Sequence, residues 1–147
     1  MERELRRGEI YYVKFRMFFD KYIPEGKKKF VLILQEGAYF AKHRSVEILL
    51  ISSDKDYKAR EDYKTDVEIE LGTTKLTQKS WALCAQPYPL NKDIFDEDGV
   101  WYAGTLSPEK MDEIDEALYN GLCMGLQNEL DKEDALVKDK EAELAAV

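Results

Sequence analysis

The sequence predicts a mainly β fold, a small antiparallel barrel or sandwich that is followed by a C-terminal α-helix. Two observations lead to this prediction. Six short segments rich in β-branched and aromatic residues precede residue 108, and we expect loops, with no intervening helices, between them. Beyond that point the apolar residues recur at helical spacing instead.

The first three strands are expected at Gly8–Phe15, Phe30–Gln35 and Val46–Ser53. Each segment is a run of branched, aromatic and other apolar residues that is too short for a typical helix. The second segment, FVLILQ, is almost continuously apolar. Such a run is typical of a strand that is buried on both faces.

The fourth strand is expected in TDVEIEL, from Thr65 to Leu71, because apolar and acidic residues alternate there. Val67, Ile69 and Leu71 should therefore face one way, and the acids should face water. The last two strands are expected at Lys79–Gln86, which Pro87 and Pro89 should end, and at Val100–Ser107.

A helix is expected to begin at Ser107, because this serine is followed by Pro108 and Glu109. A serine cap, a proline in the first turn and an early acid are typical of a helix N-terminus. The apolar stripe of the helix should cover the sheet. It consists of Met111, Ile114, Leu118, Leu122, Leu126 and Leu130.

A chain of 147 residues can bury a sizeable core. We find no internal repeat and no Gly/Ser/Pro-rich linker, so a single domain is expected over residues 1–127. Residues 128–147 hold seven acids and three lysines. We expect this acidic segment to be a solvated helical tail that is partly frayed.

Composition excludes several function classes. The formal net charge of -8 argues against a globally basic surface that coats nucleic acid. His43 is the one histidine, and neither CxxC nor HExxH spacing occurs, so we expect no metal site and no cofactor. Cys84 and Cys123 are expected to be reduced, small apolar residues. With no signal peptide and no long apolar run, the chain is expected to be cytoplasmic and without membrane contact.

The segment KFRMFFDKYIPEGKKK, residues 14–29, departs from this acidic background. It carries six cations against two acids, and aromatic residues lie between them. Cations and aromatic faces together suit single-stranded nucleic acid. Alternatively, the segment is a long hairpin loop whose aromatic residues pack on the barrel or on a subunit partner. The candidate RNA contacts in this segment are Lys14, Arg16, Phe18, Phe19, Lys27 and Lys28.

The stretch ISSD, Ile51 to Asp54, places two hydroxyl groups beside a carboxylate where the third strand ends. Ser52 and Ser53 could hold a phosphate there, or the stretch could simply cap a turn. No nucleophile elbow, phosphate-cradling glycine loop or catalytic triad is found in the sequence.

The order of these pieces resembles a known family. RGEIYYVKF, KKFVLILQ, VEILLISSD, SWALCAQ and YAGTLSPEKMDEIDEAL are similar to segments of the MazF/PemK (Kid-like) toxins of type II toxin–antitoxin systems, from about Arg7 to Leu126. The resemblance implies an SH3-like barrel that forms a homodimer and cuts single-stranded RNA without a metal. It also implies an antitoxin partner whose acidic segment fills the RNA groove.

The resemblance also suggests two catalytic residues. The arginine that the family carries at the start of its second strand, within an Arg-Pro pair, falls on Lys29 here, and a threonine at the end of the third strand falls on Ser52. In the family, the 2′-hydroxyl of the RNA is the nucleophile, so the protein moves protons and stabilises a pentavalent phosphate. Lysine keeps the charge but lacks the bidentate fork of arginine. By the same resemblance, Ser53 and Gln86 join the RNA contacts.

Two alternatives remain at this stage. The barrel could have lost catalysis and could act as a module that binds nucleic acid or an antitoxin, since lysine replaces arginine and the first loop is longer than in the family. A gyrase poison of the CcdB kind ranks last, because those proteins act through a Trp-Gly-Ile-like end and this chain ends in ELAAV.

Overall fold

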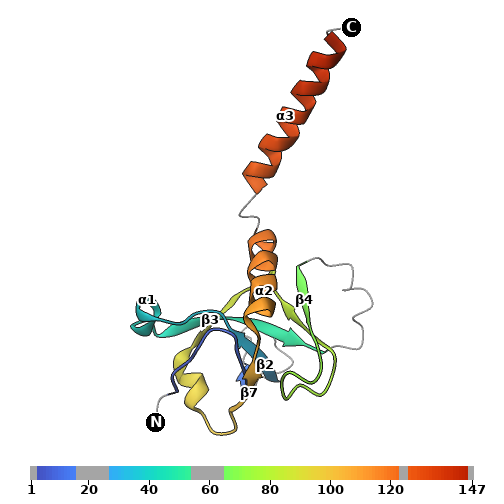
Figure 1. Ribbon diagram of the computed structural model, residues 1–147. Coiled ribbons are helices and arrows are strands. Elements are labelled where there is room, and N and C mark those ends of the chain that lie inside the picture. Colours follow the sequence, from blue (N-terminus) through green and yellow to red (C-terminus); the bar gives the residue numbers. More distant parts are fainter. Residues whose placement is uncertain (1–2, 16–26, 54–64, 123–125, 146–147) are drawn as a thin grey trace.

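The computed structural model describes residues 3–15, 27–53, 65–122 and 126–145 (Figure 1). The strands are β1 (Glu9–Phe15), β2 (Lys27–Ile33), β3 (Ser45–Ser52), β4 (Asp66–Ile69), β5 (Ser80–Leu83), β6 (Tyr88–Asn91) and β7 (Trp101–Thr105). The helices are α1 (Ala38–Ala41), the 3₁₀ helix η2 (Lys92–Asp96), α2 (Pro108–Gly121) and α3 (Leu126–Ala145).

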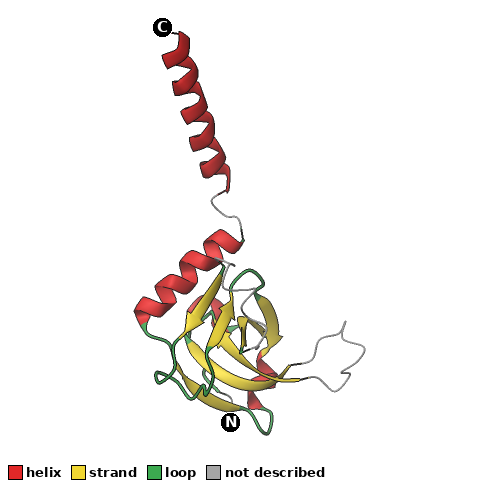
Figure 2. Ribbon diagram, turned by 90° about the vertical axis from the view of Figure 1, so that its right-hand side faces the viewer, coloured by secondary structure: helices red, strands yellow, loops and turns green. Residues whose placement is uncertain are grey.

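The described strands form one seven-stranded antiparallel sheet in the order β4-β5-β3-β2-β1-β7. The sheet curls on itself, and α2 lies against one side of it (Figure 2). β3 has a third partner, because its first half pairs with β6 and its end pairs with β5. The predicted fold class, a mainly β antiparallel barrel with a C-terminal helix, is confirmed.

Side-chain alternation on the central strands creates a core on each face of the sheet. On one face, Ile10 and Leu32 are buried together with Met111 and Ile114 of α2. On the other face, residues of the same strands, such as Val31, are buried against the η2 segment and the N-terminal segment. Full burial of such side chains stabilises the fold by roughly 1.5–3 kcal/mol each.

The predicted start of α2 is confirmed. The Ser107 hydroxyl accepts a hydrogen bond of 3.1 Å from the Lys110 backbone N–H, and proline follows the cap. The predicted stripe is buried at Met111 and Ile114, but it does not continue as one helix. α2 ends at Gly121, so Leu122 is half exposed. The last two residues of the predicted stripe belong to α3, which lies apart from the sheet in both views (Figures 1 and 2).

Three expectations about the strands are corrected. The strand expected at Lys79–Gln86 ends at Leu83, before the prolines, and an unexpected strand, β6, spans Pro89 and pairs with β3 alone among the described strands. A strand with one partner leaves one edge free, where proline loses no ladder hydrogen bond. Leu71 does not share the buried face of Ile69, because β4 ends at Ile69 and Leu71 is exposed in the following turn. Short helices, α1 and η2, also separate strands.

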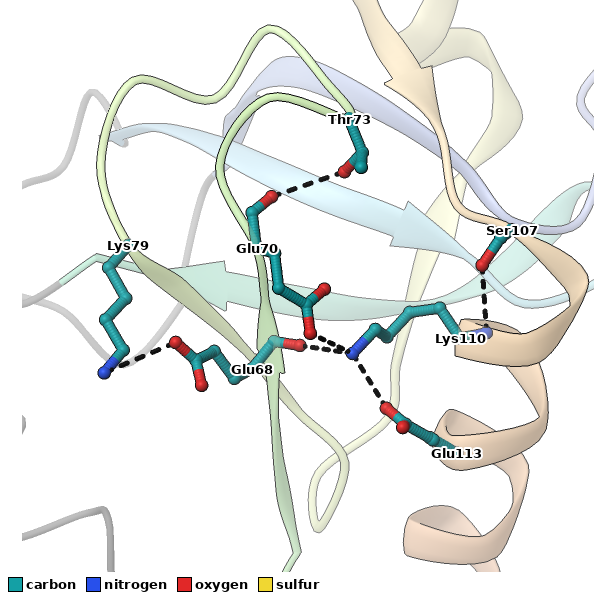
Figure 3. Close-up of polar contacts among 7 residues, drawn as sticks. All are labelled: Glu68, Glu70, Thr73, Lys79, Ser107, Lys110 and Glu113. Carbon is teal, nitrogen blue, oxygen red and sulfur yellow. Dashed lines mark hydrogen bonds and ion pairs between the residues drawn. The ribbon is translucent and has the colours of Figure 1, made fainter.

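The side chain of Lys110 joins α2 to β4 and the turn after it (Figure 3). Its ammonium group lies 2.8 Å from a carboxylate oxygen of Glu70 and 2.8 Å from one of Glu113. It also donates a hydrogen bond of 3.0 Å to the backbone carbonyl of Glu68. Burial of the ammonium lowers the pKa of Lys110, but the bonds to Glu113 and Glu70 outweigh this, so the pKa is raised.

A β-bulge in β7 changes its register against β1. Ile10 pairs with Gly104 while Tyr11 pairs with Tyr102, so Ala103 is an extra residue. The Ala103 carbonyl accepts a hydrogen bond of 2.7 Å from the backbone N–H of Lys75. The bulge places Trp101 opposite Tyr12.

None of the helices in the described ranges has both the length and the apolar character needed to cross a bilayer.

Candidate nucleic-acid interface

A surface cavity of about 370 Å³ lies where β1, β2 and β3 approach one another at one end of the sheet. It is the place where strand β2 begins with its lysines and strand β3 ends with its serines. The residues that line it are Tyr12, Lys28, Lys29, Phe30, Ile51, Ser52 and Ser53.

The strand register explains why lysines and serines meet there. Phe30 pairs with Ile51 in the antiparallel ladder between β2 and β3. The next residue in each direction is Lys29 on β2 and Ser52 on β3, so these two are cross-strand neighbours on one face of the sheet. Both are half-buried. The two residues that the family resemblance suggests as catalytic therefore lie side by side.

Alternation assigns Lys28 and Ser53 to the opposite face from Lys29 and Ser52, together with Phe30. Lys28 and Ser53 are exposed. The cavity thus receives one lysine and one serine from each face of the sheet end. Among its described lining residues there are two ammonium groups, three hydroxyl groups (one of them the Tyr12 phenol) and no carboxylate, a combination that attracts phosphate.

A third cation extends the positive charge across β1. Lys14 pairs directly with Lys28 in the antiparallel ladder between β1 and β2. Two like charges at directly opposed positions repel each other and destabilise the pair. A bound anion would relieve this repulsion, so the strand ends are better suited to a phosphate than to solvent alone.

Aromatic rings border the cavity on the β1 side. The ring of Tyr12 lies 4.7 Å from that of Phe30 and 5.3 Å from that of Trp101. Phe30 and Trp101 form an edge-to-face pair at 5.5 Å. We call Tyr12, Phe30 and Trp101 the aromatic cluster. A second hollow of about 150 Å³ shares Phe30, Ile51 and Ser53 with the cavity and continues toward residues 76–80.

The remaining predicted contacts are placed as follows. Lys27 is the first residue of β2. Gln86 is exposed in the turn after β5 and does not line the cavity. Arg16, Phe18 and Phe19 lie outside the described residues. The structure therefore brings Lys14, Lys28, Lys29, Ser52 and Ser53 to one end of the sheet.

Sequence reasoning missed Tyr12 and Trp101. Tyr12 stands in a strand where aromatic residues are expected to pack in the core. Trp101 meets Tyr12 only because of the bulge at Ala103, which shifts the register by one residue. The one signal for this bulge is Gly104, because a glycine within a strand pattern often marks a bulge.

The buried thiol of Cys84 is not a candidate nucleophile. Burial raises its pKa to about 12, and Asp66 adds to the shift, so the thiol stays protonated at neutral pH. His43 is exposed and borders a separate cavity of about 480 Å³. In the described ranges, no three His, Cys, Asp or Glu side chains are grouped as metal ligands.

Comparison with known proteins now places the chain in a class. The family model described as "PemK-like, MazF-like toxin of type II toxin-antitoxin system" matches residues 6–122. The curled antiparallel sheet with its C-terminal helix is also the fold of a solved MazE-MazF structure. The chain belongs to the PemK/MazF-like toxin family, as the resemblance in its sequence indicated.

Solved structures of similar fold agree with this assignment. An endoribonuclease from Mycobacterial species has 19% identity and a TM-score of 0.58, over 82% of this chain and 93% of that one. MazE-MazF from Deinococcus radiodurans has 13% identity and a TM-score of 0.63, over 84% and 99%. Mycobacterium tuberculosis toxin MazF-mt6 has 16% identity and a TM-score of 0.54, over 76% and 93%. A search of curated proteins gave no match.

Proposed function

We propose that the protein is a toxin of the endoribonuclease kind, which cuts single-stranded RNA at the cavity between β2 and β3 and needs no metal. The observation that supports this most directly is the register that makes Lys29 and Ser52 neighbours. These are the positions at which the family resemblance expects a cationic proton carrier and a hydroxyl donor. An RNA substrate makes the cytoplasm the expected compartment.

The chemistry follows from RNA itself. The 2′-oxygen attacks the adjacent phosphorus, the bond from phosphorus to the 5′-oxygen breaks, and a 2′,3′-cyclic phosphate forms. The 2′-hydroxyl gives its proton to solvent water, and another proton must reach the departing 5′-oxygen. The ammonium of Lys29 can supply the second proton and neutralise charge that develops on the phosphate, while the Ser52 hydroxyl can donate a hydrogen bond to a phosphate oxygen.

Lys14 and Lys28 are proposed to hold the strand rather than to react. Their pairing leaves two like charges opposed on the sheet, and a phosphate bound between them converts repulsion into attraction. Each such phosphate contact should contribute about one unit to the slope of the logarithm of the binding constant against the logarithm of the salt concentration.

The same cationic end is our proposed antitoxin site. One similar structure is of an endoribonuclease in complex with its cognate antitoxin. For this chain, we expect an acidic segment of the antitoxin to occupy the cavity in place of RNA phosphate. We also expect a homodimer, which sedimentation of the purified protein will test.

Cleavage of a labelled single-stranded RNA in a buffer with EDTA tests the catalytic proposal. Lys29→Gln and Ser52→Ala should each lower the cleavage rate by about 10²-fold, which is typical for loss of one donor to a developing oxyanion. Lys29→Arg should retain or raise the rate, because it keeps the charge and adds the bidentate fork.

Lys42→Gln is the matched control, since Lys42 is an exposed lysine that does not line the cavity. It should cleave at the wild-type rate. Undiminished cleavage in both Lys29→Gln and Ser52→Ala would remove these residues from the mechanism. Tight RNA binding by the wild type without any cleavage would instead support the binding-module alternative.

A further inference from the structure

The aromatic cluster lies in an unusual position for three large rings. Tyr12, Phe30 and Trp101 come from adjacent strands, β1, β2 and β7, through the pairings of Tyr12 with Phe30 and with Trp101. Tyr12 and Phe30 are only half-buried, and Trp101 is 38% exposed. Rings of this size are highly buried on average when they serve only the core.

The cluster is continuous with the cationic cavity. Tyr12 and Phe30 belong to the aromatic cluster and also line the cavity. Lys28 and Lys29 line the same cavity. Trp101 touches both lining rings, at 5.3 and 5.5 Å between ring centroids. An exposed indole therefore contacts two rings that line the same cavity as Lys28 and Lys29.

The indole is also held in place before any ligand arrives. Phe30 meets it edge to face at 88°, and Tyr12 meets it at 43°. A side chain that its neighbours already hold loses little conformational entropy when a ligand packs on it. A rigid, half-exposed aromatic face is the kind of surface on which an unpaired base stacks.

We propose that Trp101 is the stacking platform for one unpaired base of the RNA whose phosphate lies in the adjacent cavity. This inference rests on the proposed RNA substrate. The pairing of a flat apolar face with cations matches the two halves of a nucleotide, the base and the phosphate. An apolar side chain of a protein partner would use the aromatic face but leave the lysines without a complementary group, so a nucleotide is the better match.

The test measures binding separately from cleavage. A 2′-O-methyl RNA oligonucleotide of mixed sequence cannot supply the attacking hydroxyl, so its dissociation constant reports binding alone. An abasic strand of equal length offers the same phosphates without bases. The wild type should bind the base-containing strand more tightly than the abasic strand by roughly 5- to 100-fold, the range for stacking of one base.

Trp101→Ala should reduce this difference to within about twofold, and Trp101→Phe should keep most of it. The steepness with which the logarithm of the binding constant falls with the logarithm of the salt concentration should stay unchanged in Trp101→Ala. It should decrease by about one unit in Lys28→Gln. A loss of affinity from misfolding would instead affect both strands. Tyr119→Ala is the matched control, because Tyr119 is an exposed aromatic residue on α2.

Intrinsic fluorescence gives a second readout, because the chain has two tryptophans, Trp81 and Trp101. Binding should quench the emission of Trp81→Phe, which retains Trp101, much more strongly than that of Trp101→Phe, which retains Trp81 opposite Ser52.

Equal affinity of the wild type for the two strands, or an unchanged preference in Trp101→Ala, would overturn the stacking proposal even if the protein cleaves RNA. Base-dependent binding through Trp101 without cleavage would overturn the ribonuclease proposal and leave the platform in place. A failure to bind either strand would overturn both. If a partner peptide but neither strand protected Trp101 from quenching by iodide, the site would belong to protein recognition instead.

Discussion

Two buried acids show how single side chains respond to the core. Burial raises the pKa of the Tyr11 phenol to about 12, with help from nearby Glu9. The pKa of the Cys84 thiol is raised to about 12 in the same way. A raised pKa of an acid means that folding favours the neutral form, so its contribution to stability is complete below the pKa of the unfolded chain. That contribution is lost as pH rises toward the folded value.

Replacing Cys84 should therefore flatten the alkaline stability profile. The unfolded thiol ionises near 9.0 and the folded thiol near 12, so at pH 10.5 the wild type should have lost about 2 kcal/mol of unfolding free energy through this group. Cys84→Ala removes the ionisation. Urea unfolding at pH 7.5 and 10.5, with a reductant present, measures the difference.

Ionisation of Tyr11 destabilises both the wild type and Cys84→Ala at high pH. A smaller loss of unfolding free energy at pH 10.5 in Cys84→Ala therefore measures the contribution of the thiol alone. An equal loss in the two proteins would contradict the burial argument for Cys84.

Among the elements, β7 depends on Gly104, which follows the bulge residue Ala103. Gly104 has a φ of 134°, which side chains rarely adopt, and a Cβ there would lie 3.0 Å from the Cβ of Thr74 and 3.1 Å from its Cα. The turn that holds Thr74 also donates to the bulge carbonyl of Ala103 through the backbone of Lys75. The bulge and this turn therefore support each other.

Gly104→Ala should destabilise the protein by about 2–4 kcal/mol, because backbone strain and overlap with the Thr74 backbone act together. Gly99→Ala is the matched variant, since Gly99 also has a positive φ, of 86°, but a Cβ there meets nothing within 4 Å. It should lose only the strain, about 1 kcal/mol. Chemical unfolding of the two variants gives the comparison. Similar losses of unfolding free energy in both variants would show that Thr74 can move away from the added Cβ at little energetic cost.

The attachment of α2 to β4 depends on charge as well as on its apolar stripe. The ion pair of Lys110 with Glu70 is partly exposed on the Glu70 side, so its coupling energy should be modest, about 0.5–1 kcal/mol. The hydrogen bond from Lys110 lowers the pKa of Glu70, while the pKa of Lys110 is raised. The contribution of the ion pair to stability is therefore complete between the pKa values of the two groups in the unfolded chain, 4.5 for Glu70 and 10.5 for Lys110.

A double-mutant cycle with Lys110→Met and Glu70→Gln should give this coupling energy at pH 7. The coupling should disappear as pH falls through the lowered pKa of Glu70, because the protonated carboxyl no longer pairs. It should also fade as pH rises through the raised pKa of Lys110. A coupling that is independent of pH would indicate that packing, not charge, links the two side chains.

At the scale of the whole molecule, we propose that residues 1–127 fold as a unit and that residues 128–147 are an appendage. In α3, Leu136, Val137 and Leu144 are 61%, 54% and 77% exposed. A helix whose apolar residues stay this exposed contributes little burial energy. The segment from 128 onward also carries half of the net charge of -8.

Truncation after Gln127 should therefore leave the free energy of unfolding of the sheet and α2, measured in urea, within about 0.5 kcal/mol of that of the full chain. The same truncation should strengthen RNA binding at low salt, because it removes acidic charge that repels phosphate. Unfolding of the full chain and the shortened chain, followed by RNA titration, tests both. A large loss of stability would place α3 within the cooperative fold.

Much of this architecture can be predicted from periodicity alone. The alternation in β4, as far as Ile69, and the cap at Ser107 are local signals, and they were sufficient. β6 was missed because Pro87 before it and Pro89 within it indicate a break in a strand, and Pro89 is acceptable only because the edge of β6 away from β3 has no partner among the described strands. The end of α2 at Gly121 was missed because apolar spacing continues past it in the sequence.

The candidate site divides in the same way. Lys29 and Ser52 could be proposed in advance because each lies at the end of a recognisable strand. Trp101 could not, since its position depends on a register shift between strands about 90 residues apart in the chain. Register offsets of this kind arise from three-dimensional packing and leave only a weak trace in the sequence.

The bulge at Ala103 has a consequence for how such a protein could diversify. Without the bulge, Ala103 would pair with Tyr11, and Tyr102, not Trp101, would lie opposite Tyr12. A substitution that removes the bulge but keeps the length of β7 would therefore exchange the ring presented beside the lysines, whereas deletion of Ala103 would leave Trp101 in place. Base preference could then evolve through a register shift in β7, independently of any change in the groups proposed to act on the phosphate.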